Sequence, residues 1–360
     1  MPSSDQQATV HLSEKWAHFV QRYCLWLLLA SYGLATFWPG LGLKMRHWQW
    51  SQPTLVQVPL SLPLILLALL LFCAALVTDW AGVRSVAARP GVLVSALAAI
   101  WLGPALLVLA AGAVVPWALD GQATTGLMVG LALVATMPVA NSSVGWSQNA
   151  GGNLALSLGL VVLSITLSPW TTPQLLGLLG LSLGPADRAL CEVLVNRFSG
   201  AFFIVWVILP TALGFAVRAL VGRHRVESVD GWIVIASAAA LLILNYVNAA
   251  LALPEVWQHS QPAVLLATLL LATALSAVGL ASGWVIARLA KLPGDTESAL
   301  LFALSMKHTG LALVLAGAVL TDQPLAIFII VLATLVQHLL AGIVQWWMRG
   351  RAEGRESAKA

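Results

Sequence analysis

Charged residues are scarce in this sequence. Only 9% of its 360 residues are Asp, Glu, Lys or Arg, whereas a soluble domain carries about 25%. With 59% hydrophobic residues as well, the chain cannot cover a water-facing surface. The composition therefore excludes a water-soluble globular protein and indicates an integral membrane protein.

The sequence also has few cysteines. Cys24, Cys73 and Cys191 stand at unrelated spacings, which predicts neither a disulfide framework nor a metal site. The formal net charge of +4 comes from basic residues scattered among short segments, so nucleic-acid binding is not expected.

Long apolar runs are abundant, and each is long enough to cross a bilayer as a helix of about 20 residues. Ten spans are predicted, at about residues 23–39, 57–78, 91–116, 122–143, 151–172, 199–221, 231–251, 262–288, 297–319 and 324–347. Lys and Arg are enriched in cytoplasmic loops. If the N-terminus is cytoplasmic, the outer segments hold few of these residues, namely Lys44, Arg46, Arg188 and Arg197. Both termini of this multi-pass plasma- or inner-membrane protein are therefore predicted to be cytoplasmic.

The spans divide into two halves of five, and the odd number inverts the second half relative to the first. Residues 1–22 are polar and predict either a short amphipathic helix on the membrane surface or a disordered tail. Residues 173–198 predict an outer connector with an interfacial helix, or an extension of the fifth span. The expected parts are 1–22, a first five-helix repeat at 23–172, the connector at 173–198, a second repeat at 199–347 and a charged cytoplasmic tail at 348–360.

The fourth span of each half changes from apolar to polar in its middle. The first runs "TTGLMVGLALVATMPVANSSVG" (124–145) and the second "ESALLFALSMKHTGLALVLAGAVL" (297–320). Paired interrupted segments at matching positions of two halves point to a transporter's binding site.

Proline at 138 lacks an N–H and predicts a break in the fourth span. The freed backbone groups need partners, because lipid offers none. Polar side chains follow at once and outnumber what packing needs, which favours a polar cavity; they are Asn141, Ser142, Ser143, Ser147, Gln148 and Asn149.

Lys307 is the sharpest single feature. A lysine at a helix centre costs about 2.5–3.5 kcal/mol on insertion scales, and no Asp or Glu lies at comparable depth in the predicted spans. Carbonyls at broken helix ends, water or a bound anion could meet its charge. His308 and Thr309 follow directly and join it as candidate binding residues, and Gly310 lets the helix reopen.

These motifs resemble the bile acid:sodium symporter family. Pro138, Ser143 and "GNLALS" (152–157, which includes Asn153 and Ser157) resemble its first polar stretch, and "MKHTGLALVLA" (306–316) its ninth span. The resemblance covers about residues 22–348. It implies ten helices in two inverted five-helix repeats, forming panel and core domains. Discontinuous helices 4 and 9 would cross near the midplane beside the substrate.

The departures from that family concern its sodium ligands. Where relatives carry oxygen ligands, this chain has the residues Ala303, Val144, Val161 and Ala99. Lys307 replaces the family's glutamine, and His308 its asparagine. Ser143 and Ser157 remain.

The sequence thus predicts a secondary transporter of small organic anions, working by alternating access without sodium, in which Lys307 replaces the cation. No cofactor is expected, sodium coupling is disfavoured, and a proton carried by Lys307 is an open alternative. A sensor or channel-like protein on the same scaffold is also open. An intramembrane hydrolase using His308 is disfavoured because no carboxylate would orient the histidine. An arsenite exporter is disfavoured because neither broken span contains a cysteine. The expected partners are the organic anion and the lipid bilayer, with no nucleic acid.

Overall fold

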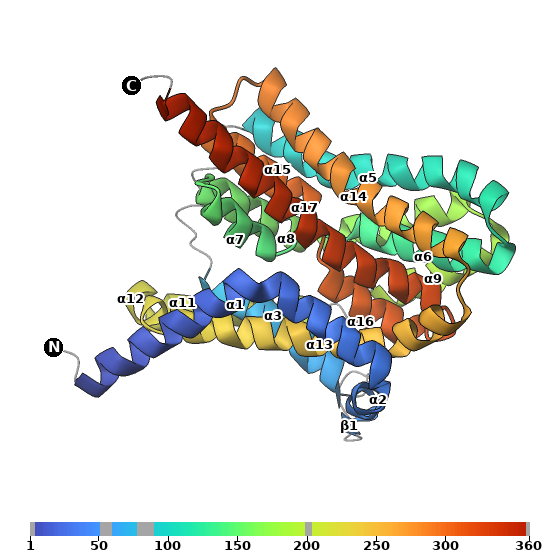
Figure 1. The fold of residues 1–360 in the computed structure, drawn as a ribbon, viewed down its shortest axis with the longest axis horizontal. Helices are drawn as coiled ribbons and strands as arrows, with labels where there is room; N and C mark the ends of the chain where they lie inside the picture. Colours follow the sequence, from blue (N-terminus) through green and yellow to red (C-terminus); the bar gives the residue numbers. More distant parts are fainter. Residues whose placement is uncertain (1–3, 51–59, 78–89, 199–203, 358–360) are drawn as a thin grey trace. The chain divides into compact units, whose positions relative to one another are not determined.

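The computed structural model describes residues 4–50, 60–77, 90–198 and 204–357, and this part of the chain is almost entirely helical (Figure 1). The one strand pair in these ranges is a two-residue antiparallel ladder of β1 (Gln49–Trp50) and β2 (Leu60–Ser61). The expected start of the second repeat at residue 199 and both ends of the second span lie outside the described residues. The prediction of an all-α membrane protein is confirmed.

The helices follow the apolar runs, because a backbone in lipid must satisfy its own hydrogen bonds. They are α1 (Ser4–Phe37), α2 (Pro39–His47), α3 (Leu62–Val77), α5 (Pro90–Ala118), α6 (Gly121–Thr136), α7 (Ser142–Asn149), α8 (Leu154–Ser182), α9 (Pro185–Phe198), the π-helix η1 (Ile204–Ile208), α11 (Leu209–Val221), α12 (Arg223–Glu227), α13 (Asp230–His259), α14 (Pro262–Leu289), α15 (Gly294–Ser305), α16 (Thr309–Val319) and α17 (Pro324–Ser357).

Six of the described helices are long and apolar enough to cross a membrane, or seven if one bent pair forms a single span. Three further apolar helices are shorter: Leu62–Val77, Gly121–Thr136 and Thr309–Val319. The chain is therefore multi-pass, while ten spans and their inverted repetition stay predictions.

Several helices run across the expected part boundaries. α1 continues through residue 22, and α17 continues into the charged C-terminal segment as far as Ser357. Between residues 173 and 198, α8 extends to Ser182 and the separate helix α9 then begins at Pro185. The position of this segment relative to the membrane stays a prediction.

The chain forms two compact units. Unit 1 comprises residues 1–78, 196–259 and 313–327. In it α1 packs along α13, and α3 packs on α11 and α13. A small apolar core of Cys73, Leu76, Val226 and Ile233 joins α3 to the α12–α13 region. Residues 39–47, expected in an outer loop, form α2, which makes a 91° bend with α1.

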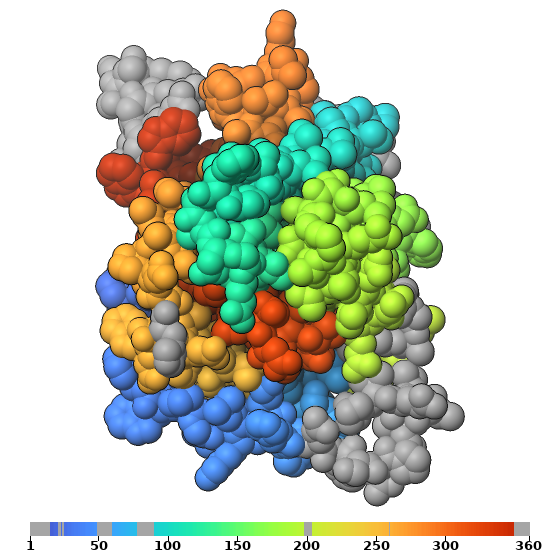
Figure 2. Space-filling model, turned by 90° about the vertical axis from the view of Figure 1, so that its right-hand side faces the viewer, coloured from blue at the N-terminus to red at the C-terminus, as the bar shows by residue number. Residues whose placement is uncertain are grey.

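Unit 2 comprises residues 79–195, 260–312 and 328–360. Here α14 packs on α15 so closely that a Cβ at Gly279 would stand 2.2 Å from the carbonyl oxygen of Leu304. α5 packs on α6, α8 and α14. Figure 2 shows α5, in green-teal, beside the yellow-green end of α8 and α9 on the surface. Large apolar side chains such as Leu106 and Trp117 are exposed on α5, as a lipid-facing helix requires.

Candidate functional site

Two helix interruptions lie in unit 2, and each is surrounded by buried residues. The first ends at Thr136 and resumes as α7 at Ser142, with Pro138 in the extended segment between them. The second ends at Ser305 and resumes as α16 at Thr309. Both interruptions coincide with the points where the sequence turns from apolar to polar.

The two breaks pair with each other. The N–H of Ala140 donates to the carbonyl of Met306 at 2.9 Å, and the N–H of His308 donates to the carbonyl of Pro138 at 2.9 Å. Val139 and Lys307 face each other in this antiparallel bridge. Each break therefore supplies partners for backbone groups that the other has freed, a role the sequence analysis gave to the side chains of residues 141–149.

Side chains of two other helices complete this pairing. The N–H of Val139 donates to the Oγ of Ser164 on α8 at 3.1 Å, and the N–H of Lys307 donates to the Oε1 of Gln337 on α17 at 3.0 Å. The backbone N–H groups of Val139 and Lys307, which face each other in the bridge, thus both bond to a side-chain oxygen of a neighbouring helix. Sequence reasoning missed Ser164, because a single serine in a Ser/Thr-rich helix gives no sign of what it will contact.

The ammonium group of Lys307 is held by backbone carbonyls. Its Nζ donates to the carbonyl of Met137 at 3.2 Å and to that of Ile100 on α5. The Ile100 carbonyl is free because its helical partner would be the N–H of Pro104, which proline lacks. Lys307 is 3% exposed, and no ion pair found in the described ranges involves it.

His308 serves as a helix cap. Its Nδ1 accepts a hydrogen bond from the N–H of Leu311 at 3.2 Å, within the first turn of α16. Nδ1 is therefore the unprotonated nitrogen when this bond forms. Thr309 and Gly310 are buried beside it in the same turn.

The first polar stretch separates into three groups. Asn153 caps α8 by accepting from the N–H of Leu156 at 3.0 Å. Gln148 and Asn149 are exposed, and Ser142 is half-buried. The remaining members carry buried oxygens for which the described part of the chain offers no hydrogen-bond partner; they are Asn141 Oδ1, Ser143 Oγ, Ser147 Oγ and Ser157 Oγ.

These four oxygens are the atoms of unit 2 best suited to an additional polar ligand, since buried polar atoms are nearly always satisfied. They belong to α7, its N-cap and the first turn of α8, and both helices pack on α15. None is a carboxylate. In the described ranges there is no group of three or more His, Cys, Asp or Glu residues that could hold a metal ion.

The positions that would carry sodium ligands in symporters are apolar here. Ala303 on α15 is 1% exposed and Val161 on α8 is 3% exposed, so neither site is open to water. Val144 on α7 and Ala99 on α5 are half-buried. A hard cation prefers oxygen ligands, and methyl groups cannot supply them.

A second polar contact links α7 to α17. The Nε1 of Trp146 donates to the Nδ1 of His338 at 3.1 Å, and the Trp146 ring stacks on Phe302 with centroids 6.4 Å apart. This contact accounts for the buried His338 as a packing hydrogen bond between helices.

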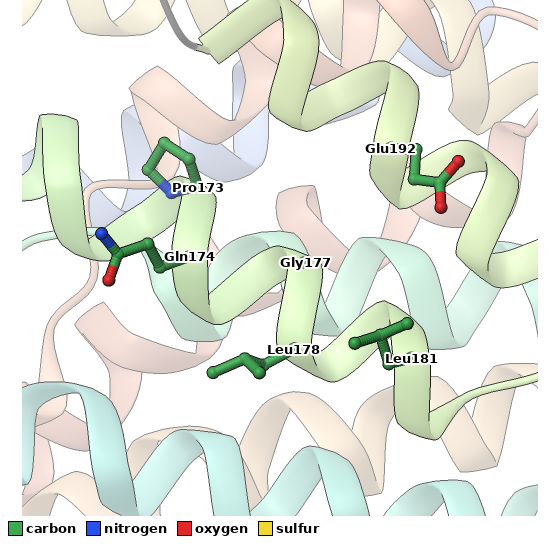
Figure 3. Close-up of a pocket in the computed structure, with 6 residues that line it drawn as sticks. All are labelled: Pro173, Gln174, Gly177, Leu178, Leu181 and Glu192. Atoms are coloured by element: carbon green, nitrogen blue, oxygen red, sulfur yellow. The ribbon is translucent and has the colours of Figure 1, made fainter.

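The groove shown in Figure 3 lies elsewhere in unit 2, between α8 and α9. It is lined by Pro173, Gln174, Gly177, Leu178, Leu181 and Glu192. Leu178 and Leu181 are largely exposed. The groove contains none of the predicted binding residues, and its lining combines apolar residues with the polar Gln174 and the acidic Glu192.

Comparison with protein families gives one match, to the SBF-like CPA transporter family, over residues 12–352. The match covers nearly the whole chain and confirms the resemblance to the bile acid:sodium symporter family. A search of curated proteins finds no match.

Proposed function

Because the chain belongs to the SBF-like CPA transporter family, we propose that it is a secondary transporter of small organic anions that works without sodium. Lys307 supplies the positive charge that a bound sodium ion gives to coupled relatives. The observation that carries this proposal is the position of the Lys307 ammonium on the carbonyls of Met137 and Ile100, at the pairing of the two helix breaks.

A covalently attached cation suits this place for an electrostatic reason. Carbonyl oxygens point at Nζ as they would at a metal ion, while the carbonyls carry no net charge to cancel that of the lysine. A buried, uncompensated positive charge attracts an anion more strongly than it would in water. It also repels sodium, whose expected ligand positions at Ala303, Val144 and Val161 are apolar.

The polar oxygens near the breaks supply the rest of the proposed site. Asn141, Ser143, Ser147 and Ser157 offer hydroxyl or amide groups that are buried and available for a ligand or for water. A few well-placed polar groups in an otherwise apolar surrounding are typical of sites that bind small organic molecules.

Uptake into proteoliposomes tests the proposal. Labelled cholate and benzoate are supplied with either sodium or potassium outside, to the native protein, to Lys307→Gln and to Lys44→Gln. Lys44 is exposed on α2 and serves as the matched control for loss of one lysine. We expect equal uptake in both salts, loss of uptake in Lys307→Gln and normal uptake in Lys44→Gln. Uptake that disappears without sodium, or that survives in Lys307→Gln, would contradict the proposal.

A further inference from the structure

Arg46 is a half-buried cation in unit 1, at a position that the sequence predicted to lie in an outer loop. It lies in the last turn of α2, the short helix that follows the 91° bend after α1. Its Nη1 donates to the Oδ1 of Asn248 on α13 at 2.9 Å, and its Nη2 donates to the carbonyl of Gly317 on α16. Asn248 is fully buried.

The bend that positions Arg46 is itself tightly determined. The hydroxyl of Tyr246 donates to the carbonyl of Trp38 at 2.8 Å and accepts from the N–H of Gly42 at 3.1 Å. It therefore stands where the first i to i−4 bond of α2 would otherwise form. A Cβ at Gly42 would lie 2.8 Å from the Cβ of Ala250, so α2 rests directly on α13. Arg46 follows Gly42 by one helical turn and is directed to the same neighbour.

Gly317 leaves the space that the guanidinium fills. A Cβ there would lie 2.7 Å from both Arg46 Nη1 and Asn248 Oδ1. Its carbonyl is also one of the last four in α16, which have no partner inside the helix. Arg46 thus sits on the negative end of the α16 dipole, in a place that three elements of unit 1 build together.

The charge of Arg46 is only partly met there. Both acceptors are neutral, and they take two of the five N–H donors of the guanidinium. No ion pair to Arg46 occurs in the described ranges. Charged residues in membrane proteins pair with one another or with backbone carbonyls, and they often mark substrate or ion pathways. The residue is half-buried, and its other three guanidinium donors have no partner among the described residues.

We propose that Arg46 is an anion-binding residue whose free edge takes the carboxylate of a small organic anion. The guanidinium fork matches a carboxylate in two parallel hydrogen bonds. Asn248 and the Gly317 carbonyl hold the fork in one orientation, so that its remaining donors are set before the ligand arrives. The inference rests on the proposed function for the ligand class, but it concerns binding and needs no transport.

Two aspartate substitutions test whether a carboxylate next to the Arg46 guanidinium stabilises the protein. Asn248→Asp places a carboxylate on the guanidinium. Asn245→Asp is the matched control, because Asn245 makes the same bond to the carbonyl four residues earlier on α13, at 2.8 Å, but accepts from Tyr32 instead of Arg46. We expect Asn248→Asp to unfold several degrees higher than Asn245→Asp. An equal or lower unfolding temperature would overturn the proposal.

The ligand arm uses cholate and benzoate, each beside its neutral amide, on the purified full chain. We expect at least one of the two acids to raise the unfolding temperature of the native protein while its amide does not. The shift should disappear in Asn248→Asp, whose carboxylate occupies the fork, and in Arg46→Gln, and it should persist in Asn245→Asp. If neither acid stabilises the native protein more than Arg46→Gln and Asn248→Asp, the proposal is wrong.

The two proposals fail separately. A shift that depends on Arg46, in a protein that moves neither acid into proteoliposomes, would reject transport and keep this site. Uptake with no such shift would reject this site and keep transport.

Discussion

Ser164 and Gln337 each accept a hydrogen bond from one backbone N–H at the paired breaks. We therefore expect both side chains to stabilise the fold. Ser164→Ala would leave the N–H of Val139 buried without an acceptor, which costs about 1–3 kcal/mol. We expect its free energy of unfolding to fall by that amount in a denaturant titration.

Thr166→Val is the control for Ser164→Ala. The Thr166 hydroxyl donates only to the carbonyl of Val162 on its own helix, at 2.8 Å, so its loss leaves no N–H unsatisfied. We expect a change within about 0.5 kcal/mol. If both variants lost the same stability, the support attributed to Ser164 would be wrong.

Cys191 on α9 reports on the packing of α9 against α8. Burial, together with the nearby carboxyl groups of Asp187 and Glu192, raises the pKa of its thiol to about 12. The thiolate is the reactive form, so the protonated thiol should persist well above neutral pH. A Cβ at Gly180 on α8 would lie 2.8 Å from that of Cys191, which shows how closely the two helices approach.

Maleimide labelling checks this packing in a protein whose other two cysteines are serine. We expect Cys191 to label slowly in the native state from neutral pH to about pH 10. At the upper end of this range an ordinary thiol, of pKa about 8.5, is almost entirely the reactive thiolate. An added cysteine at the exposed Ser182 is the control and should label rapidly. Equal rates at the two positions would show that α9 does not stay on α8.

At the scale of elements, α14 and α15 are held together by close backbone contact. Gly279→Ala would place its Cβ 2.2 Å from the carbonyl oxygen of Leu304 and 2.5 Å from the Cα of Ser305. Backbone cannot yield as a flexible side chain does, so the helices must separate next to the Lys307 break. We expect a loss of at least about 1–3 kcal/mol and weaker ligand stabilisation.

Gly177→Ala on α8 is the matched control, because no atom lies within 4 Å of the Cβ it would add. Replacing glycine by alanine inside a helix should then be neutral or slightly stabilising. The unfolding temperatures of the two variants show whether the close contact between α14 and α15 exists. A Gly279→Ala protein as stable as Gly177→Ala would contradict the described α14–α15 contact.

The sequence was informative about these elements to different degrees. It placed both helix interruptions, because Pro138 and the abrupt polarity around Lys307 are local signals. It could not show that the breaks pair with each other, because that contact joins residues far apart in the chain. It predicted Arg46 as a loop residue, because the polar last turn of α2 resembles a connector. The Tyr246 hydroxyl that replaces the first bond of α2 comes from a distant part of the chain.

At the scale of the whole molecule, composition alone indicated a multi-pass helical membrane protein, and the residues around the two breaks indicated its family. The family resemblance implied a panel and a core domain, but the segments that form each compact unit did not follow from the sequence, because each unit combines segments from both halves of the chain. The partners of Lys307 were predicted only by class: carbonyls, water or an anion. The carbonyl of Ile100 is one of these partners because Pro104 has no N–H to bond it. The sequence shows that this carbonyl lacks a helical donor, but it does not show that α5 packs beside Lys307.

The orientation of the chain in the membrane is a further prediction, and labelling from each side of the membrane tests it. Ten spans place both termini on one side of the membrane, and the distribution of Lys and Arg predicts that this side is cytoplasmic and that the residues around Lys44 lie on the opposite side. We expect membrane-impermeant labelling of cysteines added at residues 2 and 359 only from the cytoplasmic side, and at residue 44 only from the other. Termini on opposite sides would require an odd number of spans.

The central claim is that Lys307 takes the place of a sodium ion. The most direct test is the unfolding temperature of the purified native protein as sodium chloride replaces potassium chloride at constant ionic strength. A ligand that binds the native state raises stability as its concentration exceeds its dissociation constant. If Lys307 replaces sodium, the unfolding temperature should be the same at every ratio of the two salts. A saturable rise of the unfolding temperature with sodium would show that a sodium ion binds.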